Sequence, residues 1–117
     1  MKTTRTEIIV EAYAAFNRRD IPAVLGYMSR EVEWANGWEG GHVRGHEAVA
    51  EYWTRQWREL DPNVDPVDFH QRENDILDVT VHQVVKDKEG KLLFEGTVHH
   101  VYTFEGDKIS RMDIEKG

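Results

Sequence analysis

His100 is the side chain of this sequence best placed to carry out chemistry. It shares one face of a predicted strand with three apolar or aromatic neighbours, Val98, Tyr102 and Phe104. An imidazole in such surroundings would titrate near neutrality and could act as an acid, a base or a hydrogen-bond donor. The alternative is a buried histidine that is satisfied by Tyr102, by Gln83 or by a water molecule.

The other histidines do not predict a metal site. His99 points to the opposite face of the strand from His100, so the two cannot chelate one ion. His42 and His46 have the spacing of helical metal ligands, but Gly45 lies between them in a predicted loop and no carboxylate pattern accompanies them. The chain has no cysteine, which excludes disulfides, thiolate zinc sites and cysteine nucleophiles. We expect neither a metal nor a cofactor.

Aromatic residues could supply the walls of a pocket around His100. All four tryptophans fall within a short stretch of the chain: Trp34, Trp38, Trp53 and Trp57. Trp34 and Trp53 either fill the core or wall a pocket for a flat or apolar ligand. Trp38 lies in a glycine-rich loop and is a candidate for the pocket mouth or a dimer contact. Tyr13 offers a hydroxyl, on an apolar helix face, that could donate to a ligand oxygen.

The composition is that of a soluble globular domain. A length of 117 residues, with 39% hydrophobic and 32% charged residues, fits one domain over residues 1–117. The net charge of -7 and the scattered Lys and Arg argue against nucleic acid or an anionic membrane surface as a partner. The sequence contains no apolar run of the length of a signal core or a membrane span, so we expect a cytoplasmic protein.

Helices are predicted in the first half of the chain. Thr4 and Glu7 fit a capping box that opens the first helix. Asp20 is placed to cap a second helix with Pro22 in its first turn and Met28 on its buried side. A short strand at 32–34 and a glycine-rich loop follow. A third helix runs over residues 46–60 and ends at 61–63, because proline disfavours helix in the residue before it.

The second half of the chain alternates with period two. The pattern predicts four antiparallel strands, at residues 67–72, 76–86, 92–104 and 108–115. Centring the hairpin on Glu89-Gly90 places five residues on the face of His100: Leu77, Val79, Val81, Gln83 and Val85. Three helices followed by an antiparallel run, with an early extra strand, indicate an α+β fold.

Four short segments follow one another in a recognisable order. They are Tyr13-Ala-Ala-Phe-Asn-x-x-Asp20, Val32-Glu33-Trp34, Gly41-x-x-x-Gly45-x-Glu47-Ala-Val and His100-Val-Tyr-Thr-Phe-x-x-Asp107-Lys-Ile. Their order resembles the nuclear transport factor 2-like superfamily and, within it, the SnoaL-like group. The resemblance implies a cone-shaped, strongly curved antiparallel sheet whose three N-terminal helices enclose a pocket, the cystatin-like α+β roll. It also implies a homodimer through the outer face of the sheet.

The superfamily contains ketosteroid isomerases, from which this sequence departs. Those enzymes use a strand aspartate as the base, with a tyrosine and a protonated aspartate as oxyanion donors. Aligned on the quoted segments, the tyrosine position falls on Ala12, beside Tyr13, and the base position falls on Trp34. The second aspartate becomes His100. Because an indole cannot act as a base, the steroid-isomerase mechanism is disfavoured.

The SnoaL polyketide cyclases, which this chain also resembles, use a late-strand histidine and a last-strand aspartate. The resemblance implies His100 and Asp113 in these roles. Met112 and Asp113 alternate along the strand, so Asp113 faces outward if Met112 faces the pocket, unless a bulge intervenes. Asp78 also alternates to the outer face, and no buried carboxylate is evident.

These patterns together predict that the protein binds, or acts on, a small molecule in a mostly apolar pocket. His100 and Asp113 are the candidate catalytic residues, and the candidate substrate-binding residues are Tyr13, Trp34, Trp53, Gln83, Tyr102 and Met112. The expected ligand has an aromatic or polycyclic body and a carbonyl or hydroxyl group. Any reaction would be cofactor-free isomerisation, cyclisation, hydration or hydrolysis. The alternatives are a non-catalytic ligand-binding module and a dimerisation module whose cavity is filled by tryptophans.

Overall fold

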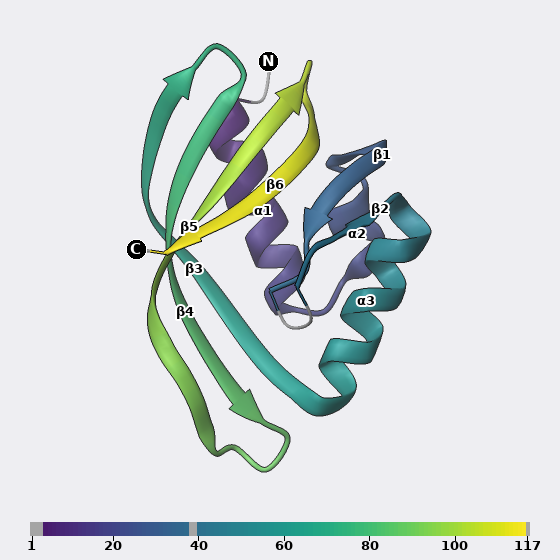
Figure 1. The fold of residues 1–117 in the computed structure, drawn as a ribbon, viewed down its shortest axis with the longest axis vertical. Helices are drawn as coiled ribbons and strands as arrows, with labels where there is room; N and C mark the ends of the chain where they lie inside the picture. The colour runs from purple at the N-terminus through teal and green to yellow at the C-terminus, as the bar shows by residue number, and fades with distance from the viewer. Residues whose placement is uncertain (1–3, 38–39, 117) are drawn as a thin grey trace.

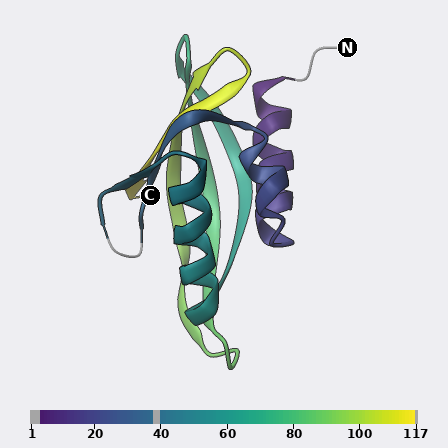
Figure 2. The same cartoon turned by 90° about the vertical axis from the view of Figure 1, so that its right-hand side faces the viewer.

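A computed structural model describes residues 4–37 and 40–116, which form three helices and six strands (Figure 1). The helices are α1 (Arg5–Asn17), α2 (Ile21–Leu25) and α3 (His46–Glu59). The strands are β1 (Met28–Ala35), β2 (His42–Arg44), β3 (Leu60–Glu73), β4 (Ile76–Asp87), β5 (Leu92–Glu105) and β6 (Lys108–Lys116). The helices lie on one side of a curved sheet whose long strands bend past them (Figure 1, and turned in Figure 2). The expected α+β cone is confirmed.

The predicted helix starts are present. The Thr4 hydroxyl accepts a hydrogen bond from the Glu7 amide at 3.1 Å, and the Glu7 carboxylate accepts one from the Thr4 amide, which completes the capping box. The Asp20 carboxylate accepts from the Ala23 amide at 3.2 Å and so caps α2. None of the helices in the described part of the chain has the length and apolarity needed to cross a lipid bilayer.

The sheet has the strand order β2-β1-β6-β5-β4-β3. Every neighbouring pair is antiparallel except β1 and β6, which run parallel. The antiparallel sheet that we expected therefore contains one parallel pair, formed between segments far apart in the sequence. This pair brings Trp34 of β1 beside Met112 of β6.

Three strands differ from the sequence prediction, and the first is β1, which spans Met28–Ala35 rather than residues 32–34. β3 begins at Leu60 rather than at residue 67, and Pro62 and Pro66 lie inside it, opposite Val85 and Val81. Both prolines are tolerated because β3 is the last strand of the sheet order, so its free edge needs no N–H donors. β2 was expected to be loop; it pairs with β1 through three residues.

The ends of the elements settle the position of Met28 and of Gly45. Met28 was placed on the second helix, but α2 ends at Leu25 and Met28 is the first residue of β1, where it is buried. Gly45 has a φ of 88° and marks the sharp entry from β2 into α3. Trp38, the predicted mouth residue, lies outside the described residues.

Candidate functional site

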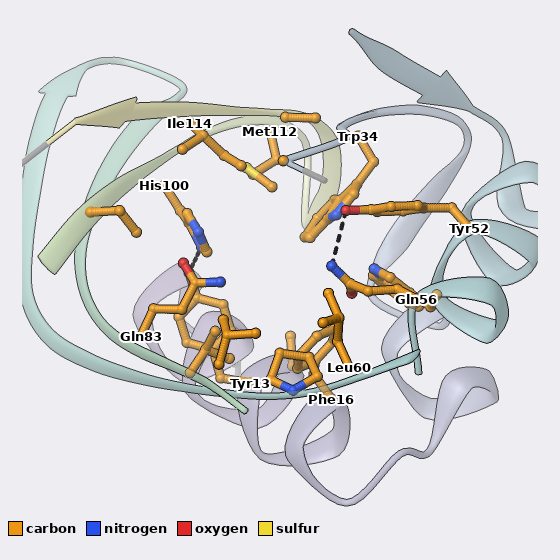
Figure 3. A pocket seen from close by; sticks show the side chains of 18 of the residues that line it. Tyr13, Phe16, Trp34, Tyr52, Gln56, Leu60, Gln83, His100, Met112 and Ile114 are labelled. Atoms are coloured by element: carbon orange, nitrogen blue, oxygen red, sulfur yellow. Dashed lines mark hydrogen bonds between the residues drawn. The ribbon is translucent and has the colours of Figure 1, made fainter. Parts of the chain in front are cut away.

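A cavity of about 690 Å³ lies between the helices and the inner face of the sheet. This volume is within the range of small-molecule sites. Tyr13 reaches it from α1, Trp34 from β1 and Trp53 from α3, while Gln83 comes from β4 and Met112 from β6. Figure 3 shows these walls around an open centre. Trp34 and Trp53 line the cavity and do not fill it.

The strand register turns His100 toward this cavity. On β4, Val79 lies opposite His100, and Val81 and Leu77 lie opposite Val98 and Tyr102. Both predicted faces of the β4–β5 hairpin are therefore confirmed. His100 is only 6% exposed and lines the cavity.

Three polar side chains form a directed hydrogen-bond chain at this wall. The Tyr102 hydroxyl donates to the Tyr13 oxygen at 2.8 Å, and the Tyr13 oxygen lies 2.7 Å from Nδ1 of His100. A phenol carries one proton, so with Tyr102 as the donor to Tyr13, Tyr13 directs its own proton to Nδ1. The neutral imidazole then carries its proton on Nε2. Among the described residues no protein group bonds to that nitrogen, so the Nε2–H is left for a ligand.

Burial keeps all three groups uncharged at neutral pH. It lowers the pKa of His100 to about 4, because the cationic imidazolium would lose its hydration. Burial also raises the pKa of Tyr13 well above its usual value and raises that of Tyr102. The expectation that His100 titrates near neutrality is therefore wrong: the cavity disfavours the charged form.

The described residues that line the cavity include no Asp, Glu, Lys or Arg. The polar side-chain groups of these lining residues are hydroxyls, amides, indole N–H groups and one neutral imidazole. Gln56 and Tyr52 project from α3, where the Gln56 amide donates to the Tyr52 hydroxyl at 3.3 Å. In Figure 3 this amide faces His100 and Gln83 across the cavity.

Comparison with known proteins assigns the family. A family model described as the SnoaL-like domain matches residues 9–112. The chain belongs to the SnoaL-like domain family. No curated protein matches it.

Solved structures similar to this SnoaL-like domain share its whole fold. A nuclear transport factor 2-like protein from Burkholderia pseudomallei is 21% identical, with a TM-score of 0.85, and the match covers 99% of this chain and 92% of that one. TerC, co-crystallised with polyporic acid, is 25% identical, with a TM-score of 0.84 and coverage of 97% and 91%. A protein with a ketosteroid isomerase-like fold from Catenulispora acidiphila, in complex with trimethylamine, is 15% identical, with a TM-score of 0.83 and coverage of 97% and 88%. The expected superfamily resemblance is confirmed.

Asp113 does not join His100 in the SnoaL-like domain. It lies on the outer face of β6, where its carboxylate accepts from Arg111 at 2.8 Å and lies 2.9 Å from Nε2 of His42. The hydrogen bond from Arg111 lowers the pKa of Asp113, so the carboxylate is ionised. The bulge between β5 and β6 falls at Thr103 and does not rotate Asp113 inward. The histidine–aspartate pair that the cyclase resemblance implied is not formed.

The six predicted substrate-binding residues all line the cavity. Trp34 meets Trp53 edge to face, with ring centroids 5.5 Å apart, and also contacts the ring of Tyr102. Asp78 and His99 lie on the outer face as predicted, joined at 2.8 Å. The described residues bring no group of three or more potential metal ligands together.

Sequence reasoning missed several lining residues. Gln56 shares a helix face with Trp53 and Leu60, so the helical period could have identified it. Leu93, Phe94 and Ile114 also line the cavity, although they are partly exposed. Their position depends on how the strands end, which alternation alone does not give.

Proposed function

We propose that this SnoaL-like domain binds a neutral, flat aromatic molecule whose carbonyl or hydroxyl oxygen accepts a hydrogen bond from Nε2 of His100. The observation that carries the proposal is the combination of an aromatic cavity, whose described lining residues include no charged side chain, with one donor oriented by the Tyr102–Tyr13–His100 chain. An anion would lose its hydration there without a cation to replace it, so the neutral form of a ligand is favoured.

The shape of the walls supports an aromatic body. Trp34 and Trp53 stand nearly perpendicular, at 87°, and so offer both a ring face and a ring edge to a planar ligand. Gln56 on the far side could hydrogen-bond a second oxygen. The similarity to TerC, crystallised with polyporic acid, also supports a small organic ligand.

Turnover is the second candidate, and the hydrogen-bond chain is the observation that favours it. A neutral imidazole donor stabilises negative charge that develops on a carbonyl oxygen, as cofactor-free isomerisation or cyclisation requires. Complete proton transfer along the chain would leave a buried phenolate on Tyr102, which its raised pKa disfavours. Because none of the described lining residues carries a carboxylate, the geometry supports binding better than proton abstraction from carbon.

Fluorescence titration with 2-acetyl-6-(dimethylamino)naphthalene, a neutral aromatic ketone, tests the proposal. We expect saturable binding that His100→Phe weakens about tenfold, the value of one buried hydrogen bond. His82→Phe makes the same change on the outer face, where His82 contacts Glu95, and should leave the affinity unchanged. Polyporic acid is titrated in parallel. Absence of saturable binding, or equal affinity of the wild type and His100→Phe, would contradict the proposal.

We also propose that two copies associate through the outer face of the sheet, in the cytoplasm. That face carries ion pairs that are already matched within one copy: Arg72 contacts Asp78 at 2.7 Å and Glu115 at 3.0 Å. Matched charges can enter an interface without leaving an unpaired group. Sedimentation velocity that shows only a monomer at high protein concentration would contradict the dimer.

A further inference from the structure

The mouth of the cavity is more apolar than its interior wall at His100. Three consecutive residues at the start of β5 are about half exposed: Leu92 at 51%, Leu93 at 50% and Phe94 at 45%. Leu93 and Phe94 both line the cavity, and we call these two residues the collar. Ile114 of β6, which is 40% exposed, lies opposite His100 and so belongs to the other end of the cavity.

A β-bulge brings two neighbouring side chains of the collar to the same place. In a regular strand Leu93 and Phe94 would point to opposite faces. The pairing of β4 with β5 shifts register here, with Val85 opposite Phe94 and Lys86 opposite Leu92. Leu93 is the extra residue, and the bulge lets both it and Phe94 face the cavity.

One glycine makes room for the collar. A Cβ atom on Gly96 would lie 3.0 Å from Cζ of Phe94. Gly96 does not have a positive φ, so backbone conformation does not require a glycine at this position. What Gly96 provides is space, which allows the Phe94 ring to lie against the backbone of its own strand.

We propose that the collar is a subsite for the apolar tail of the ligand, whose acceptor oxygen is held at His100; this inference rests on the proposed function. His100 and Phe94 lie six positions apart on β5, which is at most about 20 Å of strand. A bicyclic head at His100 does not span that length, and the walls continue without interruption to the collar. The ligand class is therefore an aromatic ketone or related oxygenated ring with an alkyl or aryl group at the end opposite the oxygen.

A pair of probes that differ only in the tail tests the collar. We compare 2-acetyl-6-(dimethylamino)naphthalene with its 6-dibutylamino homologue, and the ratio of their dissociation constants is the readout. Each methylene that becomes buried tightens binding by a factor of about four, so we expect the dibutyl probe to bind at least about tenfold more tightly to the wild type.

The variants distinguish protein contacts with the tail of the ligand from contacts with its head. Phe94→Ala and Gly96→Ala should reduce the ratio to about two; in Gly96→Ala the new methyl group displaces the far end of the Phe94 ring while the backbone is unchanged. Leu92→Ala removes an equally exposed side chain that does not line the cavity, and it should preserve the ratio. His100→Phe should weaken both probes equally and also preserve the ratio.

Each outcome decides between the two proposals. A ratio near one in the wild type, a ratio unchanged in Phe94→Ala and Gly96→Ala, or the same loss in Leu92→Ala overturns the collar. So does a Phe94→Ala variant that changes the sedimentation coefficient and not the ratio, since the exposed side chains then serve self-association. If the collar variants reduce the ratio while His100→Phe changes the affinity of neither probe, the collar proposal is supported and the proposed hydrogen bond at His100 is wrong. Circular dichroism confirms that each variant is folded.

Discussion

Acidification should unfold this SnoaL-like domain chiefly through one side chain, His100. In the part of the chain that the structure describes, the groups that face it are Tyr13 from α1, Tyr102 from its own strand and the uncharged lining of the cavity, and none of these is a carboxylate that could compensate an imidazolium. Its pKa of about 4 in the folded state lies below the 6.5 of a solvated histidine. The unfolded chain therefore takes up the proton first, and the free energy of unfolding falls as the pH falls from 6.5 toward 4.

The size of the effect follows from that difference in pKa. The stabilisation by neutral His100 is fully present above pH 6.5 and amounts to about 3 kcal/mol relative to pH below 4. Between pH 7 and pH 5 the loss is about 2 kcal/mol. This is a large share of the stability of a small domain, which is commonly about 5–15 kcal/mol.

Urea unfolding at pH 7, 6 and 5, followed by circular dichroism, measures this loss. His100→Gln is the matched control because glutamine has no proton to titrate in this range. The other ionisable groups contribute to both proteins alike, including Asp78 and Asp113, whose lowered pKa values move their contribution to more acidic solution. The wild type should lose about 2 kcal/mol more than the variant between pH 7 and pH 5. Parallel pH profiles of the two proteins would refute the reasoning.

Three further changes test the core, a helix cap and the hydrogen-bond chain. Trp53→Ala should lower the free energy of unfolding by about 3–5 kcal/mol, because the indole is 1% exposed; a loss below 1 kcal/mol in urea would show that the cavity collapses to fill the space. Asp20→Ala removes the α2 cap and should lower it by about 1 kcal/mol in the same assay, whereas Asp20→Asn, which retains the acceptor, should not. The triple variant Tyr13→Phe, Tyr102→Phe, His100→Leu should be as stable as the wild type or more stable, while probe binding is lost. A strongly destabilised triple variant would show that the hydrogen-bond chain has a structural role instead.

The sequence was sufficient where a pattern is local or strictly alternating. The capping box at Thr4 and the Asp20 cap involve partners three residues apart, so their contacts could be predicted directly. The inward face of β5 followed from alternation and one hairpin turn, which together set His100 opposite Val79. For the same reason Asp113 was expected on the outer face when Met112 faced inward.

The sequence was insufficient where a feature depends on segments far apart in the chain or on the cavity as a whole. The parallel pairing of β1 with β6 joins chain segments about 80 residues apart, and no local pattern specifies it. Pro62 and Pro66 read as strand breakers until the sheet order shows that β3 is an edge. The pKa of His100 depends on burial by helices that precede it by many residues, so an apolar strand pattern alone did not predict its depression.

The hydrogen-bond chain is itself an argument for a ligand. Tyr102, Tyr13 and His100 satisfy one another's hydrogen bonds. An apolar side chain at each position would nevertheless avoid the free-energy cost of desolvating three polar groups in the core. The chain ends on an imidazole nitrogen with no protein partner among the described residues, beside a cavity large enough for a small molecule. With the Tyr102 hydroxyl as the first donor, each donor fixes the direction of the next, and the group presented to the cavity is a donor. A ligand that offers an acceptor oxygen completes this arrangement, whereas an ammonium or amide N–H group would leave two donors facing each other.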